Sequence, residues 1–278
     1  MRILVTGSTG FVGRHTVERL VKSGHDVIAT ARNPKKASLM PWFNKVEFIE
    51  CDLAADFQIL LNLAPKIDAI IHLAWTGLPN YLDFSHIEKN FVISLNFLHK
   101  AIISGVPRIV VAGSCLEYGL QEGALKEATN THPITAYGFA KDALRKSLQF
   151  LKNKYNFDLK WIRLFYVYGE GQSSGSLLSQ LDLAIESGDE VFNMSPGDQI
   201  RDFVPIEYAA EVICMSVDSS ALQGVINCCS GNPKSVLDFV KERCIKKGSN
   251  IALNLCFYDY PSYEPYEFWG VSESLNIK

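Results

Sequence analysis

The feature that most constrains the fold is a glycine-rich segment, TGSTGFVG, which directly follows the first apolar run, RILVT. It places Gly7, Gly10 and Gly13 between a predicted strand and a helix predicted to begin near Phe11. The first glycine permits a tight turn, the second lets the backbone approach a pyrophosphate, and the third lets the helix pack on the sheet. We interpret the segment as a dinucleotide-binding turn, the alternative being a glycine turn without a ligand. We also assign to this turn Thr9, Phe11 and Val12.

Short β-branched runs alternate with helical patterns through the first half of the chain. The runs are RILVT, DVIAT, VEFIE, DAIIHLA, RIVVAGS and DLKWIRL. This alternation is typical of βαβ units and predicts an α/β fold, a doubly wound parallel Rossmann sheet. We expect residues 1–168 to form the cofactor-binding domain. Residues 169–278 are expected to form mostly a smaller C-terminal α/β substrate-binding part, with some strands and helices returning to the first domain.

Two helices are predicted from apolar residues at steps of three or four. The first spans residues 81–104, and the second begins near Thr135. The first is expected to face the core through Phe84, Ile87, Phe91, Leu95, Leu98 and Ile102.

Composition narrows the class of partner. A net charge of −3 over 278 residues provides no basic field for nucleic acid or an anionic membrane. No apolar run approaches the roughly 20 residues that span a bilayer, so we expect a cytoplasmic protein with a small-molecule partner. The cysteines form no CxxC pair, which argues against disulfides and a metal site. We predict as buried Cys51, Cys214, Cys228, Cys229, Cys244 and Cys256.

The end of the second predicted strand indicates which dinucleotide binds. An NAD site usually has an acidic residue there, to accept the adenine ribose hydroxyls. Here the strand ends in Ala31 and is followed by Arg32. A guanidinium without a carboxylate suits a 2′-phosphate, so we predict NADP(H), with Arg14 and Lys35 as possible further contacts. The alternative is that Arg32 is an ordinary solvated loop residue.

Ser114, Tyr137 and Lys141 form a candidate catalytic group. Tyr137 and Lys141 are four residues apart on the second predicted helix and so share a face. An ammonium beside a phenol is expected to lower the tyrosine pKa, which allows proton exchange with a carbonyl or hydroxyl near neutral pH. Ser114 follows RIVVAG and lies at the carboxyl edge of the sheet, where ligands of open α/β folds bind.

Several segments in order resemble the extended short-chain dehydrogenase/reductase family, specifically its enzymes for nucleotide-linked sugars. The resemblance covers residues 2–215 approximately. It rests on TGSTGFVG, Cys51-Asp52-Leu53, His72-Leu73-Ala74, Asn90 with NFL, Ser114 with EYG, YGFAK, RLFYVYG and GDQIRDFV.

The resemblance implies roles for further residues. Asp52 and Leu53 would contact adenine, Leu73, Ala74 and Trp75 would line the cofactor path, and Asn90 would brace the catalytic helix. Asp52 could instead cap a helix, Asn90 could satisfy a buried backbone group, and His72 is read as a packed strand residue. Lys141 would hold the nicotinamide ribose and tune Tyr137. A homodimer is also implied.

Arg201 resembles the arginine with which this family grips the substrate diphosphate. It could alternatively pair with Asp202. Tyr166 departs from the family pattern, in which asparagine is usual, and is the candidate substrate contact at that position. Glu117 and Tyr118 lie close enough to Ser114 in sequence to contact the sugar, although Glu117 could also be an exposed residue without a role.

The residues after Ser114 discriminate between reactions of the resembling family. A 4,6-dehydratase carries an acid and a base there, whereas this chain has Cys115 and Leu116. An epimerising reductase carries a cysteine two positions after the serine, where Leu116 stands. We therefore predict NADPH-dependent reduction of a 4-keto-6-deoxyhexose on a nucleotide carrier, as in deoxysugar synthesis for surface polysaccharides. The alternatives are a 4-epimerase with bound cofactor and a non-catalytic NADP(H)-binding regulator.

Overall fold

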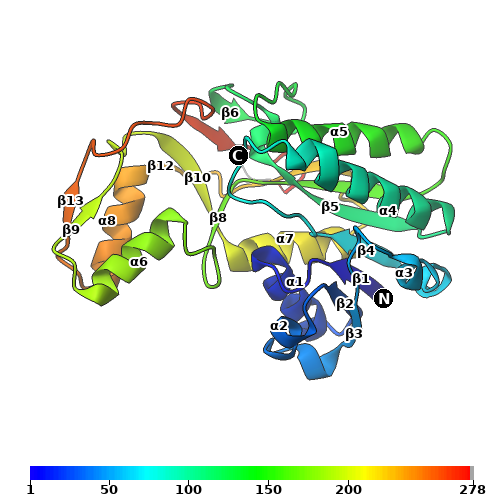
Figure 1. Ribbon diagram of the computed structural model, residues 1–278. Helices are drawn as coiled ribbons and strands as arrows, with labels where there is room; N and C mark the ends of the chain where they lie inside the picture. The colour runs from blue at the N-terminus through cyan, green and yellow to red at the C-terminus, as the bar shows by residue number, and fades with distance from the viewer. Residues whose placement is uncertain (276–278) are drawn as a thin grey trace.

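A computed structural model describes residues 1–275 and contains a seven-stranded parallel sheet in the order β11-β7-β5-β4-β1-β2-β3 (Figure 1). The chain order reverses between β1 and β4, which is the switch point where ligands bind in doubly wound folds. The predicted Rossmann fold is therefore confirmed. The strands are β1 Arg2–Thr6, β2 Asp26–Ala31, β3 Glu47–Glu50, β4 Ala69–His72, β5 Arg108–Ser114, β7 Asp158–Leu164 and β11 Gly224–Cys228.

Helices cover both faces of this sheet because successive strand residues point to opposite sides. Ile3 and Val5 of β1 belong to the layer under α1 (Phe11–Lys22) and α7 (Ile206–Asp218). Leu4 belongs to the opposite layer. That layer is covered by α3 (Gln58–Leu61), α4 (Val92–Ile103) and α5 (Ala136–Leu151).

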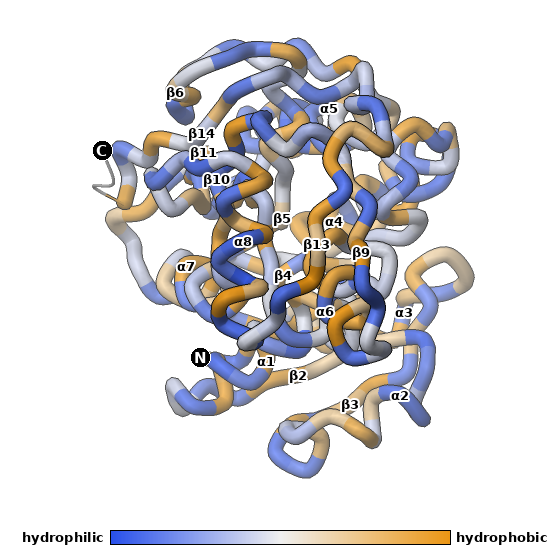
Figure 2. Tube along the Cα trace, turned by 90° about the vertical axis from the view of Figure 1, so that its left-hand side faces the viewer, coloured by the Kyte–Doolittle hydropathy of each residue, from blue (hydrophilic) through white to orange (hydrophobic). Residues whose placement is uncertain are grey.

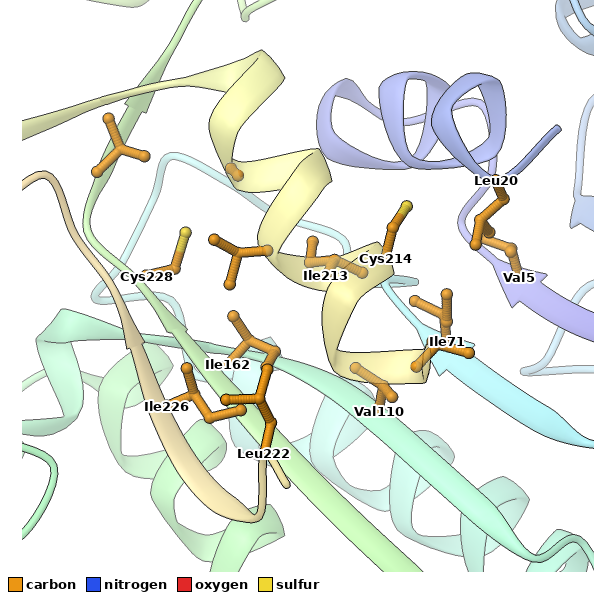
Figure 3. Packing of buried hydrophobic residues seen from close by; sticks show 14 of the residues in the cluster. Val5, Leu20, Ile71, Val110, Ile162, Ile213, Cys214, Leu222, Ile226 and Cys228 are labelled. Carbon is orange, nitrogen blue, oxygen red and sulfur yellow. The ribbon is translucent and has the colours of Figure 1, made fainter. Parts of the chain in front are cut away.

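The first of these layers is seen closely in Figure 3. Ile213 and Cys214 of α7 lie over the sheet, near Val110 of β5 and Ile71 of β4. Ile226 of β11 belongs to the same cluster. Both α7 and β11 lie beyond residue 168. The chain thus returns to the large sheet after this residue, as the predicted division allowed.

The rest of the second half forms a smaller part beside the large sheet (Figure 1). A core of its own contains Leu181, Phe192, Phe239 and Val240. In Figure 2, which looks onto this part, β9 and β13 run side by side. Its elements are β8 Tyr166–Tyr168, α6 Leu177–Ser187, β9 Val191–Asn193, β10 Ile200–Pro205, β12 Pro233–Ser235, α8 Val236–Lys247 and β13 Ala252–Asn254.

Three further short elements lie outside these groups. α2 (Pro34–Ser38) follows β2, and β6 (Gly123–Leu125) pairs with β14 (Phe268–Gly270). None of the helices within residues 1–275 is long and apolar enough to cross a membrane.

The predicted helix over residues 81–104 is wrong at its start. The helical backbone begins with a π-helical turn, His86–Phe91, and continues as α4. Before it, Asp83 Oδ1 accepts a hydrogen bond from the backbone N–H of Ser85, which favours a turn, and Phe84 is 69% exposed rather than core-facing.

Among the cysteines predicted to be buried, Cys256 is exposed. It has a positive φ of 62° outside the helices and strands.

Candidate active site

The glycine turn after β1 requires its glycines. Gly7 has φ +70°, and a Cβ there would lie 2.7 Å from the backbone nitrogen of Ala74. A Cβ on Gly13 would collide with the carbonyl oxygen of Gly7. Gly10 is the N-cap of α1 and provides no side-chain cap for its first turn. The turn thus brings β1, β4 and the open N-terminus of α1 together, an arrangement that suits an anionic group.

A cleft of about 390 Å³ runs along this edge of the sheet. Phe11, Val12 and Gly13 form the first turn of α1 and do not line the cleft. The predicted cofactor residues that line it are Gly7, Thr9, Gly10, Arg32, Asp52, Leu53, Leu73, Ala74, Trp75 and Asn90.

One end of the cleft is cationic. Arg32 follows β2 and lines the cleft together with Lys36 of α2. Asn33 caps α2 by accepting a hydrogen bond from the Lys36 N–H at 2.9 Å. Neither of the two expected further contacts lines the cleft: Lys35 is absent from its wall, and Arg14 forms an ion pair with Glu170 at 2.6 Å. Lys36 of α2, which the sequence analysis missed, lines the cleft wall in their place.

The three candidate catalytic side chains come together at the ends of β5 and α5. Ser114 ends β5, and its hydroxyl accepts a hydrogen bond from the Leu116 N–H at 3.2 Å and contacts the Tyr137 hydroxyl. Tyr137 lies in the first turn of α5, which Thr135 caps. Lys141, one turn further along, donates through Nζ to the carbonyl oxygen of Ala112 at 2.8 Å.

The electrostatics of this group differ from the prediction. Burial raises the pKa of Tyr137 above its ordinary value, and the hydrogen bond with Ser114 opposes that rise. Burial lowers the pKa of Lys141 to about 7. The expectation that Lys141 lowers the Tyr137 pKa is wrong, because the ammonium contacts the Ala112 carbonyl and lies 3.8 Å from the Trp75 ring centroid instead of the phenol oxygen. Desolvation is therefore the largest cause of the pKa shifts of both Tyr137 and Lys141.

Aromatic side chains surround Tyr137. Trp75 and His86 meet its ring edge-on, with centroids 5.9 and 5.2 Å away, and Tyr81 lies at 5.5 Å. The Trp75 indole N–H donates to His86 Nδ1 at 3.0 Å. Trp75 also lines the cleft, so it connects the cleft wall with Tyr137 and Lys141. Tyr81 and His86 were missed because they flank a loop and a π-helical turn, which leave no periodic signal.

Asn90 and Asp52 both line the cleft while serving local roles. Asn90 Oδ1 accepts from the N–H and hydroxyl of Thr76, both at 3.0 Å, so it braces the loop after β4 and not the catalytic helix as expected. Asp52 Oδ1 accepts from the Ala54 N–H at 3.0 Å. His72 is a packed strand residue between Thr6 and Ser94, and burial lowers its pKa to about 3.

Glu117 and Tyr118 were predicted to contact a sugar, and the structure contradicts this. Both are fully buried, because a 3-10 turn at Cys115–Glu117 directs them away from the cleft. Glu117 pairs with Arg163 at 2.8 Å. The Tyr118 hydroxyl donates to Asn227 Oδ1 at 2.7 Å. Closeness to Ser114 in sequence was misleading.

Arg201 and Tyr166 form a second buried polar group, in the smaller part. Arg201 Nε donates to the Tyr166 hydroxyl at 3.1 Å. Its NH2 group pairs with Glu264 at 2.9 Å, so the internal partner is Glu264 and not Asp202. The Asp202 carboxylate instead accepts from the backbone N–H groups of Ser230, Gly231 and Gly270.

Fold and site together describe a dinucleotide-binding oxidoreductase scaffold, and comparison with known proteins identifies its family. A sequence model of the NAD dependent epimerase/dehydratase family matches residues 3–229. The chain belongs to this family, which confirms the resemblance to extended short-chain dehydrogenases/reductases.

Individual relatives match over nearly the whole chain. The dTDP-6-deoxy-L-talose 4-dehydrogenase (NAD(+)) of Aggregatibacter actinomycetemcomitans is 29% identical over 272 residues, covering 97% of this chain and 99% of the relative. The ADP-L-glycero-D-manno-heptose-6-epimerase of Brachyspira hyodysenteriae is 27% identical over 252 residues, covering 86% and 79%. The solved structure of MoeE5 in complex with UDP-glucose and NAD has a TM-score of 0.84 at 26% identity, covering 98% and 90%.

Proposed function

We propose that this protein is an NADP(H)-dependent oxidoreductase that interconverts the 4-keto and 4-hydroxyl forms of a nucleotide-linked 6-deoxyhexose, with reduction as the working direction. The observation that carries the proposal is the meeting of Ser114, Tyr137 and Lys141 beside Trp75, which lines the cleft that also holds Arg32 and Lys36. The reverse of a 4-dehydrogenase reaction is a 4-keto reduction. The name of the Aggregatibacter relative therefore supports a reaction at carbon 4 of the sugar.

The residues of the cleft fit a dinucleotide. The Gly7 turn leaves room for backbone approach, and the α1 N-terminus provides N–H groups for the phosphates. When bound, the reduced nicotinamide supplies a hydride. Tyr137 holds the proton for the sugar oxygen at its hydroxyl and Ser114 orients that oxygen, while Lys141, one helical turn further along, is proposed to hold the nicotinamide ribose.

The neighbours of Ser114 support reduction over dehydration. A dehydratase needs an acid and a base next to the sugar, and the positions after Ser114 are Cys115 and Leu116. Burial raises the pKa of Cys115 far above its ordinary value, so this thiol is a poor proton donor or acceptor. Glu117, the first carboxylate after them, is held by Arg163.

Arg201 is proposed to hold the substrate diphosphate by exchanging the Glu264 carboxylate for phosphate oxygens. The guanidinium is directed by Tyr166 and by the carbonyl oxygens of Ile200 and Tyr266, at 2.8 and 3.0 Å. The NH2 group that Glu264 occupies is the donor at which a phosphate oxygen would replace the carboxylate, because both acceptors are anionic.

Oxidation of NADPH, followed by its near-ultraviolet absorbance with a panel of nucleotide-linked 4-keto-6-deoxyhexoses, tests the reaction. We expect turnover with one carrier, and a loss of about 10²- to 10⁴-fold in Tyr137→Phe with unchanged cofactor affinity. Tyr155→Phe, at the opposite edge of the sheet, is the matched control. Tight NADPH binding without turnover on any sugar would contradict the proposal and favour a regulator, and sugar interconversion without net NADPH loss would favour an epimerase.

Cofactor preference is tested by Arg32→Ala. Loss of a charge-assisted contact to the 2′-phosphate is expected to weaken NADPH binding about tenfold or more and to leave NADH binding unchanged. The relative named for NAD(+) shows why this needs measurement. Fluorescence titration of both cofactors gives the two dissociation constants. Lys35→Ala, three residues further along in α2 and outside the cleft wall, is the control. Equal weakening of both cofactors would assign Arg32 to another part of the dinucleotide.

A further inference from the structure

Glu117 is a completely buried carboxylate with no part in the reaction as proposed above. Its Oε1 accepts hydrogen bonds from the backbone N–H of Ser114 and from the indole N–H of Trp161, both at 2.8 Å. Its Oε2 accepts from Arg163 Nε at 2.8 Å. Burying a carboxylate is costly unless it is paired and hydrogen-bonded, so a structure that does so at this point must gain something from it.

The carboxylate joins the three elements that frame the catalytic group. Ser114 ends β5, Trp161 and Arg163 belong to β7, and Arg145 of the catalytic helix α5 lies 3.8 Å from Oε2. The backbone leaves room for it: a Cβ on Gly113 would lie 2.5 Å from Glu117 Oε1 and would collide with the Trp161 indole nitrogen. Glu117 therefore links the Ser114 turn to β7 through hydrogen bonds and to α5 through the contact with Arg145.

Lys141 is bound to the same strand end. Its ammonium donates to the Ala112 carbonyl, two residues before the Ser114 N–H that Glu117 binds. Within residues 1–275 no carboxylate forms an ion pair with Lys141. The groups around it are the Trp75 and Tyr137 rings and neutral His72. The negative charge that does act on it is that of Glu117.

We propose that Glu117 is a positioning residue of the catalytic turn: it fixes the Ser114 backbone against α5 and β7, and its charge favours the ammonium form of Lys141. The same charge raises the pKa of Tyr137, which keeps the phenol protonated as a proton donor. Arg163 and Arg145 face Glu117 from the side away from Ser114, through the other carboxylate oxygen. The consequence for turnover rests on the proposed function, whereas the two structural effects do not.

Two measurements on the free protein separate geometry from charge. In Glu117→Asp the charge stays but the shorter side chain cannot reach both Ser114 and Arg163. Hydrogen exchange of the Ser114 amide should accelerate about tenfold or more, as expected for loss of a hydrogen bond to a charged group, with Lys141 titrating as before. In Glu117→Gln the shape stays but the charge is lost. The Lys141 titration, followed by ε-carbon NMR and assigned with Lys141→Met, should move down by about one pH unit or more.

Glu117→Gln leaves Arg163 buried without a counter-charge, so a second variant that combines it with Arg163→Met retains the test if the single variant does not fold. Asp182→Asn, which breaks the ion pair with Arg243 in the smaller part, should change neither readout. An unmoved Lys141 titration in a folded Gln variant overturns the charge role, and an unchanged Ser114 exchange rate in Glu117→Asp overturns the positioning role. If the sugar panel shows turnover, its pH profile must shift with the Lys141 titration. If it shows none, the proposed function fails while these two readouts still decide on Glu117.

Discussion

Within residues 1–275, two arginine–carboxylate pairs have an almost fully buried guanidinium group, and they are built differently. Both guanidinium groups, of Arg163 and Arg201, are 2% exposed. Glu117 is 0% exposed and lies in the 3-10 turn that follows β5 of the large sheet. Glu264 is 14% exposed and comes from the segment 255–267, which contains no helix and no strand beyond a single bridge at Glu267. The carboxylate of the first pair is enclosed, whereas that of the second is partly open to solvent, as the proposed exchange with a phosphate requires.

Arg201 is also better supported than Arg163 when its carboxylate is removed. It retains the Tyr166 hydroxyl and two carbonyl oxygens as acceptors. Arg163 retains one carbonyl, that of Glu127, at 3.3 Å. A donor that keeps several acceptors loses less when one partner leaves. The two pairs therefore differ in how strongly the fold depends on them.

The largest expected effect is on stability. Glu117→Gln should lower the free energy of unfolding by about 3–5 kcal/mol, because it leaves a buried charge uncompensated. Glu264→Gln should lower it by only about 1–2 kcal/mol, because Arg201 keeps its other acceptors. Urea unfolding of the two variants measures the difference. Equal losses would contradict the comparison and would show that residues 255–267 are as much part of the framework as the catalytic turn.

Lys141 adds to the catalytic region a buried cation that has no ion-pair partner among residues 1–275, and its effect on stability depends on pH. Its pKa of about 7 in the folded protein lies below its ordinary value of 10.5. Between these two pH values the unfolded chain binds a proton that the folded protein does not, so stability should rise with pH across this window. Below about pH 7 the cost of burying the ammonium is fully present.

Lys141→Met should therefore raise stability at neutral pH and flatten the rise toward pH 10. Lys146→Met, on the same helix with a half-exposed side chain, is the control and should leave the pH dependence as it is. Urea unfolding at a series of pH values measures both. A wild-type stability that stays level across this window would show that Lys141 keeps an ordinary pKa despite its burial.

The parts of the site that the sequence predicted are those placed by local rules. The Gly7 turn follows a strand, Ser114 ends another, and Tyr137 and Lys141 share one helix face through their spacing. The structure brings the last three together for that reason. Arg32 was likewise found from its place at the end of β2, whereas Lys36 lies in α2 beyond that position and was not.

What could not be predicted depends on contacts between distant residues. Glu117 was assigned to the substrate because it is near Ser114, but its direction is fixed by Arg163, 46 residues away. Arg201 meets Glu264 at a separation of 63 residues. No periodicity or motif encodes such a pairing, since either partner alone is compatible with a solvated surface. The partners of buried charges are the information that only the fold supplies.

The smallest expected effect tests whether the Arg201 pair is exchangeable. Glu264→Gln should strengthen the binding of dTDP or UDP by about tenfold or less, because the phosphates no longer compete with a carboxylate for the guanidinium. Calorimetric titration of the free protein gives both affinities. Glu267→Gln, three residues along the same segment, should have no effect, since Glu267 accepts a hydrogen bond from the Gly123 N–H through its backbone carbonyl oxygen.

Either departure from this expectation changes the reading of the second pair. Weaker nucleotide binding in Glu264→Gln would mean that the carboxylate itself holds the ligand, for instance through hydroxyl groups, and that the pair is a binding surface rather than a competitor. Unchanged binding would remove Arg201 from the nucleotide site and make the pair structural, like that of Glu117 with Arg163. Tighter nucleotide binding in Glu264→Gln is the outcome that supports the comparison. The Glu117–Arg163 pair would then be fixed, and the Glu264–Arg201 pair would be exchangeable at the proposed diphosphate site.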